Sequence, residues 1–173
     1  MGVKQTGAGS SYVDLAWNAQ LGAGHYHTQF SQDGKNWIDM EYSSSPSDSV
    51  YNLTQGASYY ARVVAYNGSH YSGTHVMVGV SETAIVSTKP TEVTGLTQTA
   101  AGVNSVSMSW NASAGAASYV IYGYINYNWT QIGTSATNSA TITGVAATTS
   151  TKFSVAAVKN VTGGTVTGDQ CSG

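Results

Sequence analysis

Apolar and polar side chains alternate in short segments along the whole chain. Between residues 13 and 17, Val13, Leu15 and Trp17 alternate with smaller or polar neighbours, and the segment 106–110 repeats this order. A period of two with one apolar face is typical of a half-buried β-strand, whereas an amphipathic helix has a period of about 3.6 residues. Because no segment shows a convincing helical period, we expect an all-β protein.

A second strand is predicted after the first in each half of the chain. In the segment 25–30 alternate residues share one face, and the segment 119–124 shows a related pattern. Asp33-Gly34 is a turn signal of the kind that joins antiparallel strands. Short strands separated by turn signals at regular intervals predict an antiparallel sandwich.

The chain contains two related halves. The segment that starts at Val3 aligns with the one that starts at Leu96, so that Trp17 and Trp110 correspond at an offset of 93 residues. This period is too long for a solenoid, whose units have about 20 to 50 residues, and it predicts tandem domains. Pro90 lies between the copies and stiffens the joint. We expect one domain at 1–88, a joint at 89–91 and a second domain at 92–173.

The segment Leu53–Asn67, with the sequence LTQGASYYARVVAYN, follows the order L-x-x-G-x-x-Y and then alternates small or branched residues with larger ones. This order resembles the corner between the fifth and sixth strands of fibronectin type III domains. Trp17 and Trp110 match the tryptophan of the second strand, and the resemblance extends over nearly the whole chain. It implies two tandem immunoglobulin-like sandwiches, in which Gly56 turns the chain and Tyr59 anchors the corner through its buried ring and its hydroxyl.

The second copy departs from this pattern at its own corner. Thr148 stands where Gly56 stands in the first copy, and Thr151 stands where Tyr59 does. Phe153 is larger than the alanine it replaces and is expected to refill the core. We therefore predict that the second domain is the less stable of the two.

The charge and the cysteine content of the chain limit the classes of function that are open to it. Charged residues make up 8% of the chain and the net charge is −2, so the chain has no basic field to hold nucleic acid. No apolar run approaches the roughly 20 residues of a membrane helix, so we expect no membrane insertion. Cys171 is the single cysteine; it forms either an intermolecular bridge or, as we favour, a free and inert thiol.

The motifs of catalysis are not found in the sequence. It has no G-x-S-x-G, H-E-x-x-H or C-x-x-C, so we expect neither an enzyme nor a cofactor. His25 and His27 share one face of a strand, a spacing that can serve a metal. His70 and His75 join them only over a long reach. We therefore interpret the pair as solvated strand histidines and predict no metal site.

The outer face of two neighbouring strands in each domain is the predicted binding or assembly surface. Tyrosine and arginine provide contact area with polar tips, although exposed tyrosine is also simply a good strand former. The residues of this surface are His25, His27, Tyr60, Arg62 and Tyr66 in the first domain and Tyr122, Tyr124 and Tyr127 in the second. A long loop after the sixth strand is the predicted recognition loop, with Asn67, His70, Tyr71 and His75.

Three functions stay open at this point. The leading expectation is a non-catalytic structural or adhesion module exposed on a virion or cell surface, which contacts a protein or a glycan. The first alternative is a spacer or weak carbohydrate-binding accessory module of a secreted polysaccharide-degrading enzyme. The second is an extracellular filament subunit that assembles with copies of itself.

Overall fold

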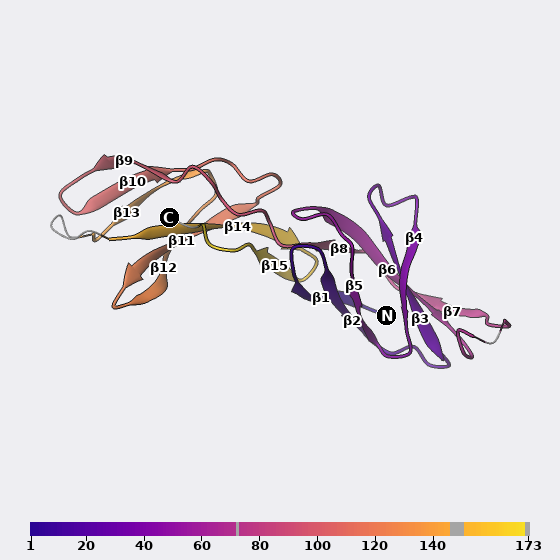
Figure 1. Cartoon of the computed structure of the whole chain (residues 1–173). Helices are drawn as coiled ribbons and strands as arrows, with labels where there is room; N and C mark the ends of the chain where they lie inside the picture. The colour runs from indigo at the N-terminus through magenta and orange to yellow at the C-terminus, as the bar shows by residue number, and fades with distance from the viewer. Residues whose placement is uncertain (72, 146–150, 172–173) are drawn as a thin grey trace. The chain divides into compact units, whose positions relative to one another are not determined.

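The structure is a computed structural model that describes residues 1–71, 73–145 and 151–171. All regular elements of these residues are β-strands (Figure 1), so the predicted all-β class is confirmed. The chain divides into two compact units, Met1–Lys89 with Asn160–Val166 and Pro90–Lys159 with Thr167–Gly173. The domain limits derived from the sequence stay predictions. No described helix is long and apolar enough to cross a membrane.

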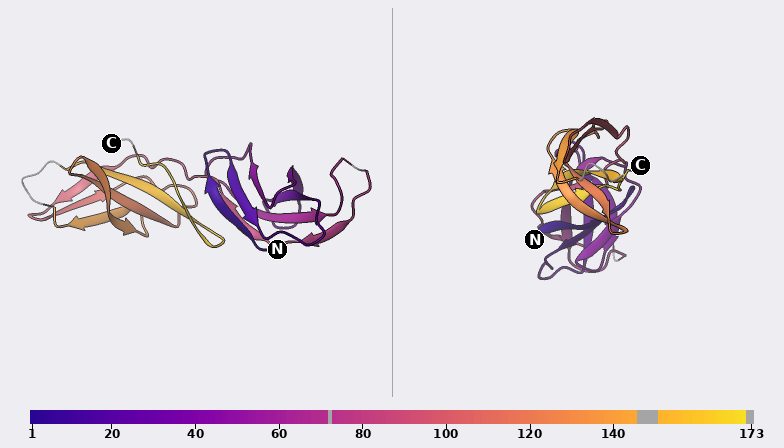
Figure 2. Two further views of the ribbon diagram at one scale, coloured as in Figure 1. Left: turned by 90° about the horizontal axis from the view of Figure 1, so that it is seen from below. Right: turned by 90° about the vertical axis from the view of Figure 1, so that its left-hand side faces the viewer.

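The first unit contains two antiparallel sheets, whose layers can be followed in Figure 2. The smaller sheet has the order β1-β2-β5 and consists of β1 (Val3–Ala8), β2 (Val13–Trp17) and β5 (Ser47–Val50). The larger has the order β4-β3-β6-β7, and β8 also pairs with β6; it consists of β3 (His25–Ser31), β4 (Ile38–Ser43), β6 (Ser58–Tyr66), β7 (Met77–Val80) and β8 (Ala84–Ser87).

The second unit repeats this layout. Its first sheet has the order β13-β10-β9 and consists of β9 (Thr97–Ala101), β10 (Ser105–Ser109) and β13 (Ser139–Thr143). The other sheet has the order β12-β11-β14-β15 and consists of β11 (Ser118–Ile125), β12 (Asn128–Ser135), β14 (Phe153–Val161) and β15 (Gly164–Thr167), although residues 160–166 of the last two strands are grouped with the first unit. The equivalent order of strands in both units agrees with the internal repeat of the sequence.

Apolar residues of facing strands form a separate core in each unit. In the first, Trp17 of β2 meets Tyr26 of β3 edge to face at 5.4 Å between ring centroids. In the second, Trp110 and Tyr119 repeat this contact at 5.3 Å. Both tryptophans are buried, and burying such a ring stabilises the fold by about 3 kcal/mol. The structural role predicted for Trp17 and Trp110 agrees with this packing.

The corner before β6 is built as the resemblance implied. The Tyr59 ring is in the core, and its hydroxyl accepts a hydrogen bond of 3.0 Å from the Thr54 amide. Gly56 has a φ of 69°, a conformation that residues with a Cβ resist. In the second unit Thr148 lies outside the described residues, but Phe153 packs against the core as predicted.

Candidate functional site

The outer face of β3 and β6 collects the histidines of the first unit. The strands pair in antiparallel register, with His25 opposite Tyr66 and His27 opposite Val64. Figure 1 shows β7 beside β6, and the segment 67–76 connects the two strands. This segment turns back over the face and carries the other two of the four histidines of the chain, His70 and His75. All four imidazole rings therefore meet at one place.

The contacts between these rings are close. His27 Nε2 lies 3.2 Å from His70 Nδ1. One ring nitrogen each of His25, His27 and His70 lies within 4.8 Å of the other two. His75 meets His25 edge to face, at 5.1 Å between centroids. The prediction that His70 and His75 reach the strand pair only over a long distance is therefore wrong.

The prediction that both strand histidines are solvated is also wrong. His25 exposes only 2% of its surface, and His27 is half-buried. His25 Nδ1 lies 3.1 Å from the carbonyl oxygen of Gly68. Because a carbonyl only accepts, Nδ1 must carry the hydrogen, and Nε2 then presents a bare lone pair. This buried Nε2 has no hydrogen-bond partner among the described residues.

Glycine makes the contact of His25 with Gly68 possible. A Cβ placed on Gly24 would overlap the Gly68 carbonyl, so a side chain at residue 24 would displace the acceptor. The Gly24 amide also donates to the Tyr66 carbonyl at 2.7 Å. The orientation of the His25 ring is thus set by its contact with the Gly68 carbonyl, for which glycine at residue 24 leaves room.

Aromatic stacking positions the other rings. His70 stacks on Tyr42 of β4 at 4.1 Å between centroids with an interplanar angle of 5°. His25 stacks on Tyr66 at 5.3 Å and 14°. The hydroxyls of Tyr42 and Tyr71 form a hydrogen bond. A hollow of about 450 Å³ opens beside these rings.

The surroundings of His27 favour its neutral state. Burial lowers the pKa of His27 below its usual value, the Asp39 carboxylate opposes this effect, and His25, His70 and His75 add to the lowering. Asp39 Oδ1 lies 4.0 Å from His27 Nδ1, on the side of the ring away from His70. A neutral imidazole keeps one nitrogen lone pair available.

The predicted recognition loop is closed at its base by Asn67. The Asn67 amide donates to the Val76 carbonyl at 3.0 Å, and its side-chain oxygen accepts from the Val76 amide at 2.7 Å. Tyr71 lies at the exposed end of this loop. The closed base directs His70 and His75 back onto the strand histidines.

The rest of the predicted surface in the first unit is held by side-chain contacts. The Arg62 guanidinium lies 4.1 Å from the centroid of the Trp37 ring, and Arg62 Nε donates to the Gln29 side chain at 2.7 Å. Tyr60 lies next along the same face and is exposed. Arg62 and Trp37 thus form a cation–π pair on this face.

The second unit presents an aromatic patch at the hairpin of β11 and β12. Tyr124 and Trp129 are paired across the strands and meet at 5.3 Å between centroids. Both are about two-fifths exposed, and Tyr127 at the turn is 90% exposed. Tyr122 precedes them on the same face of β11 and is half-buried. Trp129 was missing from the predicted surface, although a tryptophan that follows Tyr124 and Tyr127 so closely in the sequence was a usable signal.

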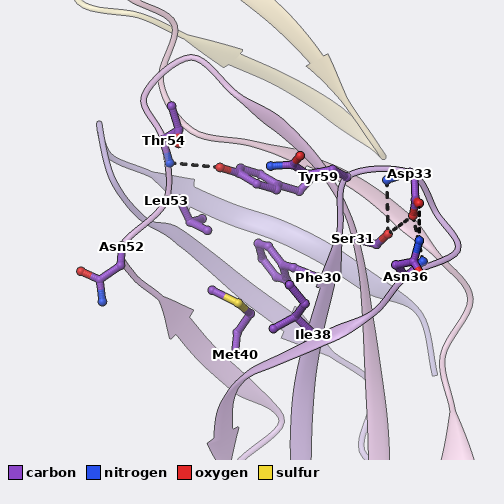
Figure 3. Close-up of a pocket in the computed structure, with 11 residues that line it drawn as sticks. Phe30, Ser31, Asp33, Asn36, Ile38, Met40, Asn52, Leu53, Thr54 and Tyr59 are labelled. Carbon is purple, nitrogen blue, oxygen red and sulfur yellow. Dashed lines mark hydrogen bonds between the residues drawn. The ribbon is translucent and has the colours of Figure 1, made fainter.

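A hollow of about 510 Å³ lies between the turn after β3 and the corner before β6. Figure 3 shows the apolar side chains Phe30, Met40 and Leu53 on its wall, with Tyr59 above them. Asp33 at its rim accepts from the amides of residues 35 and 36, and these bonds hold its pKa well below the usual range. The Asp33 carboxylate is hydrogen-bonded within the turn. The hollow therefore has an apolar wall and a polar rim whose carboxylate already has partners.

Comparison with solved structures decides the fold. The structure of three chicken CNTN1 fibronectin domains, FN1-FN3, superposes with a TM-score of 0.51 at 15% identity and covers 98% of this chain and 63% of that one. The chain has the fold of tandem fibronectin type III domains. A two-domain fibronectin type III segment of chicken tenascin matches 99% of this chain and 95% of its own, with 17% identity and a TM-score of 0.48.

Sequence comparison adds a bacterial relative of these fibronectin type III domains. No family model matches the chain. Chitinase A1 of Niallia circulans is 33% identical over 162 residues, which is 89% of this chain and 22% of the enzyme. The chain therefore spans about a fifth of the length of the curated relative that it matches.

Proposed function

We propose that the chain is a non-catalytic accessory part of a secreted polysaccharide-degrading enzyme, in which the tandem sandwiches act as a spacer and contact glycan weakly. The observation that carries this proposal is the 33% identity of nearly the whole chain to about a fifth of a chitinase. The remaining four-fifths of that enzyme leave room for a separate catalytic region. This favours the first alternative drawn from the sequence over the virion or adhesion function.

The hydrogen bonds of three of the eight acidic side chains support a non-catalytic function. Asp33 caps a turn, Asp14 accepts from the Ser49 hydroxyl at 2.7 Å, and Asp39 accepts from the Gln29 side chain at 2.7 Å. Glycoside hydrolysis needs two carboxyl groups that face a common substrate. These three carboxylates instead serve hydrogen bonds within turns and strands.

The aromatic patch of the second unit supports contact with glycan. Tyr124, Tyr127 and Trp129 present apolar ring faces with polar tips to solvent. Such rings stack on the apolar faces of sugars, while the hydroxyl and indole N–H bond to sugar hydroxyls. A flat polysaccharide surface can be reached by a hairpin tip without a deep pocket.

Binding to insoluble polysaccharide tests this proposal. We expect the chain to be depleted from solution by chitin or cellulose, and the double variant Tyr127→Ala with Trp129→Ala to lose most of this depletion. The matched control is Tyr51→Ala, which removes an exposed tyrosine from the first unit. If neither polymer depletes the parent chain, or if the control loses binding equally, the proposal is wrong.

A structural or adhesion function on a cell surface or virion is the second candidate. The same exposed rings favour it, because tyrosine and tryptophan anchor protein interfaces as well. In that case the partner is a protein surface or a second copy of the chain. Sedimentation of the purified chain over a range of concentrations separates self-assembly from the first candidate, since a self-assembling subunit grows in mass and an accessory module stays monomeric.

A further inference from the structure

The histidine cluster of the first unit has the composition of a metal centre. His25, His27 and His70 each offer a ring nitrogen, and these nitrogens lie within 4.8 Å of one another. Imidazole nitrogen suits zinc, copper, iron and nickel, whereas magnesium and calcium prefer oxygen. The donor set therefore selects a transition-metal ion.

The spacing of the nitrogens fits such an ion with small ring movements. Zinc binds imidazole at about 2.0 to 2.1 Å, so two ligands of a tetrahedral ion stand about 3.3 Å apart. His27 Nε2 and His70 Nδ1 already lie 3.2 Å apart. The nitrogen of His25 needs to approach by no more than about one and a half ångströms to complete a three-nitrogen face.

A second observation points to a ligand independently of the spacing. The Nε2 of His25 is buried and has no partner among the described residues, although buried polar atoms in proteins are nearly always satisfied. Its ring cannot use Nδ1 instead, because that nitrogen donates to Gly68. A buried lone pair that a backbone contact holds in place is the arrangement of a metal-binding histidine, whose other nitrogen bonds to a carbonyl or carboxylate.

Neighbouring side chains also set the orientation of the His27 and His70 rings. Asp39 faces His27 Nδ1 and leaves Nε2 directed at His70. Tyr42 stacks on His70 and fixes the plane of its ring. Each candidate ligand thus has a neighbouring group that sets its orientation. Such groups, which do not bind the metal themselves, are typical of metal centres.

We propose that His25, His27 and His70 bind one first-row transition-metal ion, with Zn²⁺ as the natural probe, and that this ion ties the 67–76 segment to β3. The proposal goes beyond the accessory function and does not depend on it. His27 and His70 are 43 residues apart, so the ion would close a long loop of the chain. The expected consequence is a more stable first unit and a fixed recognition loop.

Calorimetric titration of the full chain, prepared without a polyhistidine tag and stripped with a chelator, tests the proposal. We expect one Zn²⁺ per chain, and a rise of about 10 to 20 °C in the unfolding midpoint of the first unit at a hundredfold excess of zinc over Kd. His27→Gln and His70→Gln are expected to weaken binding by about a hundredfold or more, since each removes a ligand. His70 lies in the loop, so its variant keeps the sandwich folded, which circular dichroism checks.

Tyr51→Phe is the matched control, because Tyr51 is an exposed tyrosine of the same unit whose ring contacts Tyr12 rather than the histidines. It should leave the zinc affinity of the parent chain unchanged. Nitrogen NMR of the imidazole rings should show the His25 Nε2 signal shift on addition of zinc while Nδ1 keeps its hydrogen. Undetectable binding, binding that survives His70→Gln, or an unshifted His25 signal would overturn the proposal.

Discussion

The hydroxyl of Tyr59 accepts a 3.0 Å hydrogen bond from the backbone amide of Thr54, and this bond ties the buried ring to the corner of the first unit. The ring that carries the hydroxyl lies in the core between the two sheets. In the second unit the equivalent residue is Thr151, which has no ring to bury. The two sandwiches therefore differ at the tyrosine of this corner.

Tyr59→Phe is expected to destabilise the first unit by about 1 to 2 kcal/mol. The phenylalanine keeps the packing of the ring but leaves the Thr54 amide without its acceptor, which costs the desolvation of a donor. Urea denaturation of the full chain measures the change. Tyr60→Phe is the matched control, since Tyr60 is exposed and its change should stay within about 0.5 kcal/mol. Equal losses of stability in the two variants would contradict the role of the Tyr59 hydroxyl at this corner.

The two units are expected to unfold separately, the second at the lower temperature. The described core of the second unit is smaller than that of the first, and its corner lacks the tyrosine. Scanning calorimetry of the full chain should show two transitions. Tyr59→Phe assigns them, because it should move only the upper one. A shift of the lower transition instead would reverse the predicted order of stability.

Tyr26→Phe and Tyr119→Phe are expected to lower the free energy of unfolding of their units by nearly the same amount, about 1 kcal/mol each. The two hydroxyls accept from the amides of Gln20 and Ser113, both at 3.0 Å. Each variant should lower only its own calorimetric transition. A large difference between the two costs would show that the internal repeat does not extend to these hydrogen bonds.

The strands and the corner could be predicted because their signals are local. Alternation in 13–17 fixes which side chains of β2 face the core, and the spacing of Gly56 and Tyr59 fixes a turn within four residues. Alternation also placed His25 and Tyr66 on the outer face of their strands, and the register of β3 and β6 sets the two residues opposite each other. Each of these inferences needs only the next few residues of the chain.

The histidine cluster could not be predicted because it depends on distant backbone. His25 is buried by the Gly68 carbonyl, whose approach requires glycine at residue 24 and a loop closed between Asn67 and Val76. Alternation places a strand histidine on the outer face and says nothing of a loop that later covers that face. Four histidines in one chain of low charge were a weak signal, and only the folded loop brings them together.

Asp48→Asn is expected to stabilise the first unit at neutral pH and to have little effect at pH 3. Burial raises the pKa of Asp48 above 3.8, and the charge of Glu41 adds to this, while hydrogen bonds from Ser49 and Thr28 oppose it. As the pH rises above the ordinary pKa, Asp48 stays protonated to a higher pH in the native state than in the unfolded chain. Parent stability therefore falls as pH rises through that window.

The difference between parent and variant across pH isolates Asp48 from the other carboxyl groups. Urea midpoints measured from pH 3 to 8 should diverge in favour of the variant as pH rises past 3.8, and the difference should then stay constant. Asp33→Asn is the opposite control. The turn bonds hold the pKa of Asp33 well below its usual range, so this variant should lose stability at neutral pH. The same sign for both variants would contradict the interpretation.

The thiol of Cys171 is expected to react slowly in the native chain and to form no dimer. The side chain is buried, and its Sγ accepts a hydrogen bond of 3.1 Å from the Val155 amide of β14. A buried thiol reacts slowly because a reagent cannot reach the sulfur until the fold opens locally. Reaction with a disulfide reagent should therefore be at least about a hundredfold slower than in urea, since it requires local opening of the fold. A native rate close to the unfolded one, or a disulfide-linked dimer on a non-reducing gel, would show that the C-terminal segment leaves β14 often enough to support the intermolecular bridge.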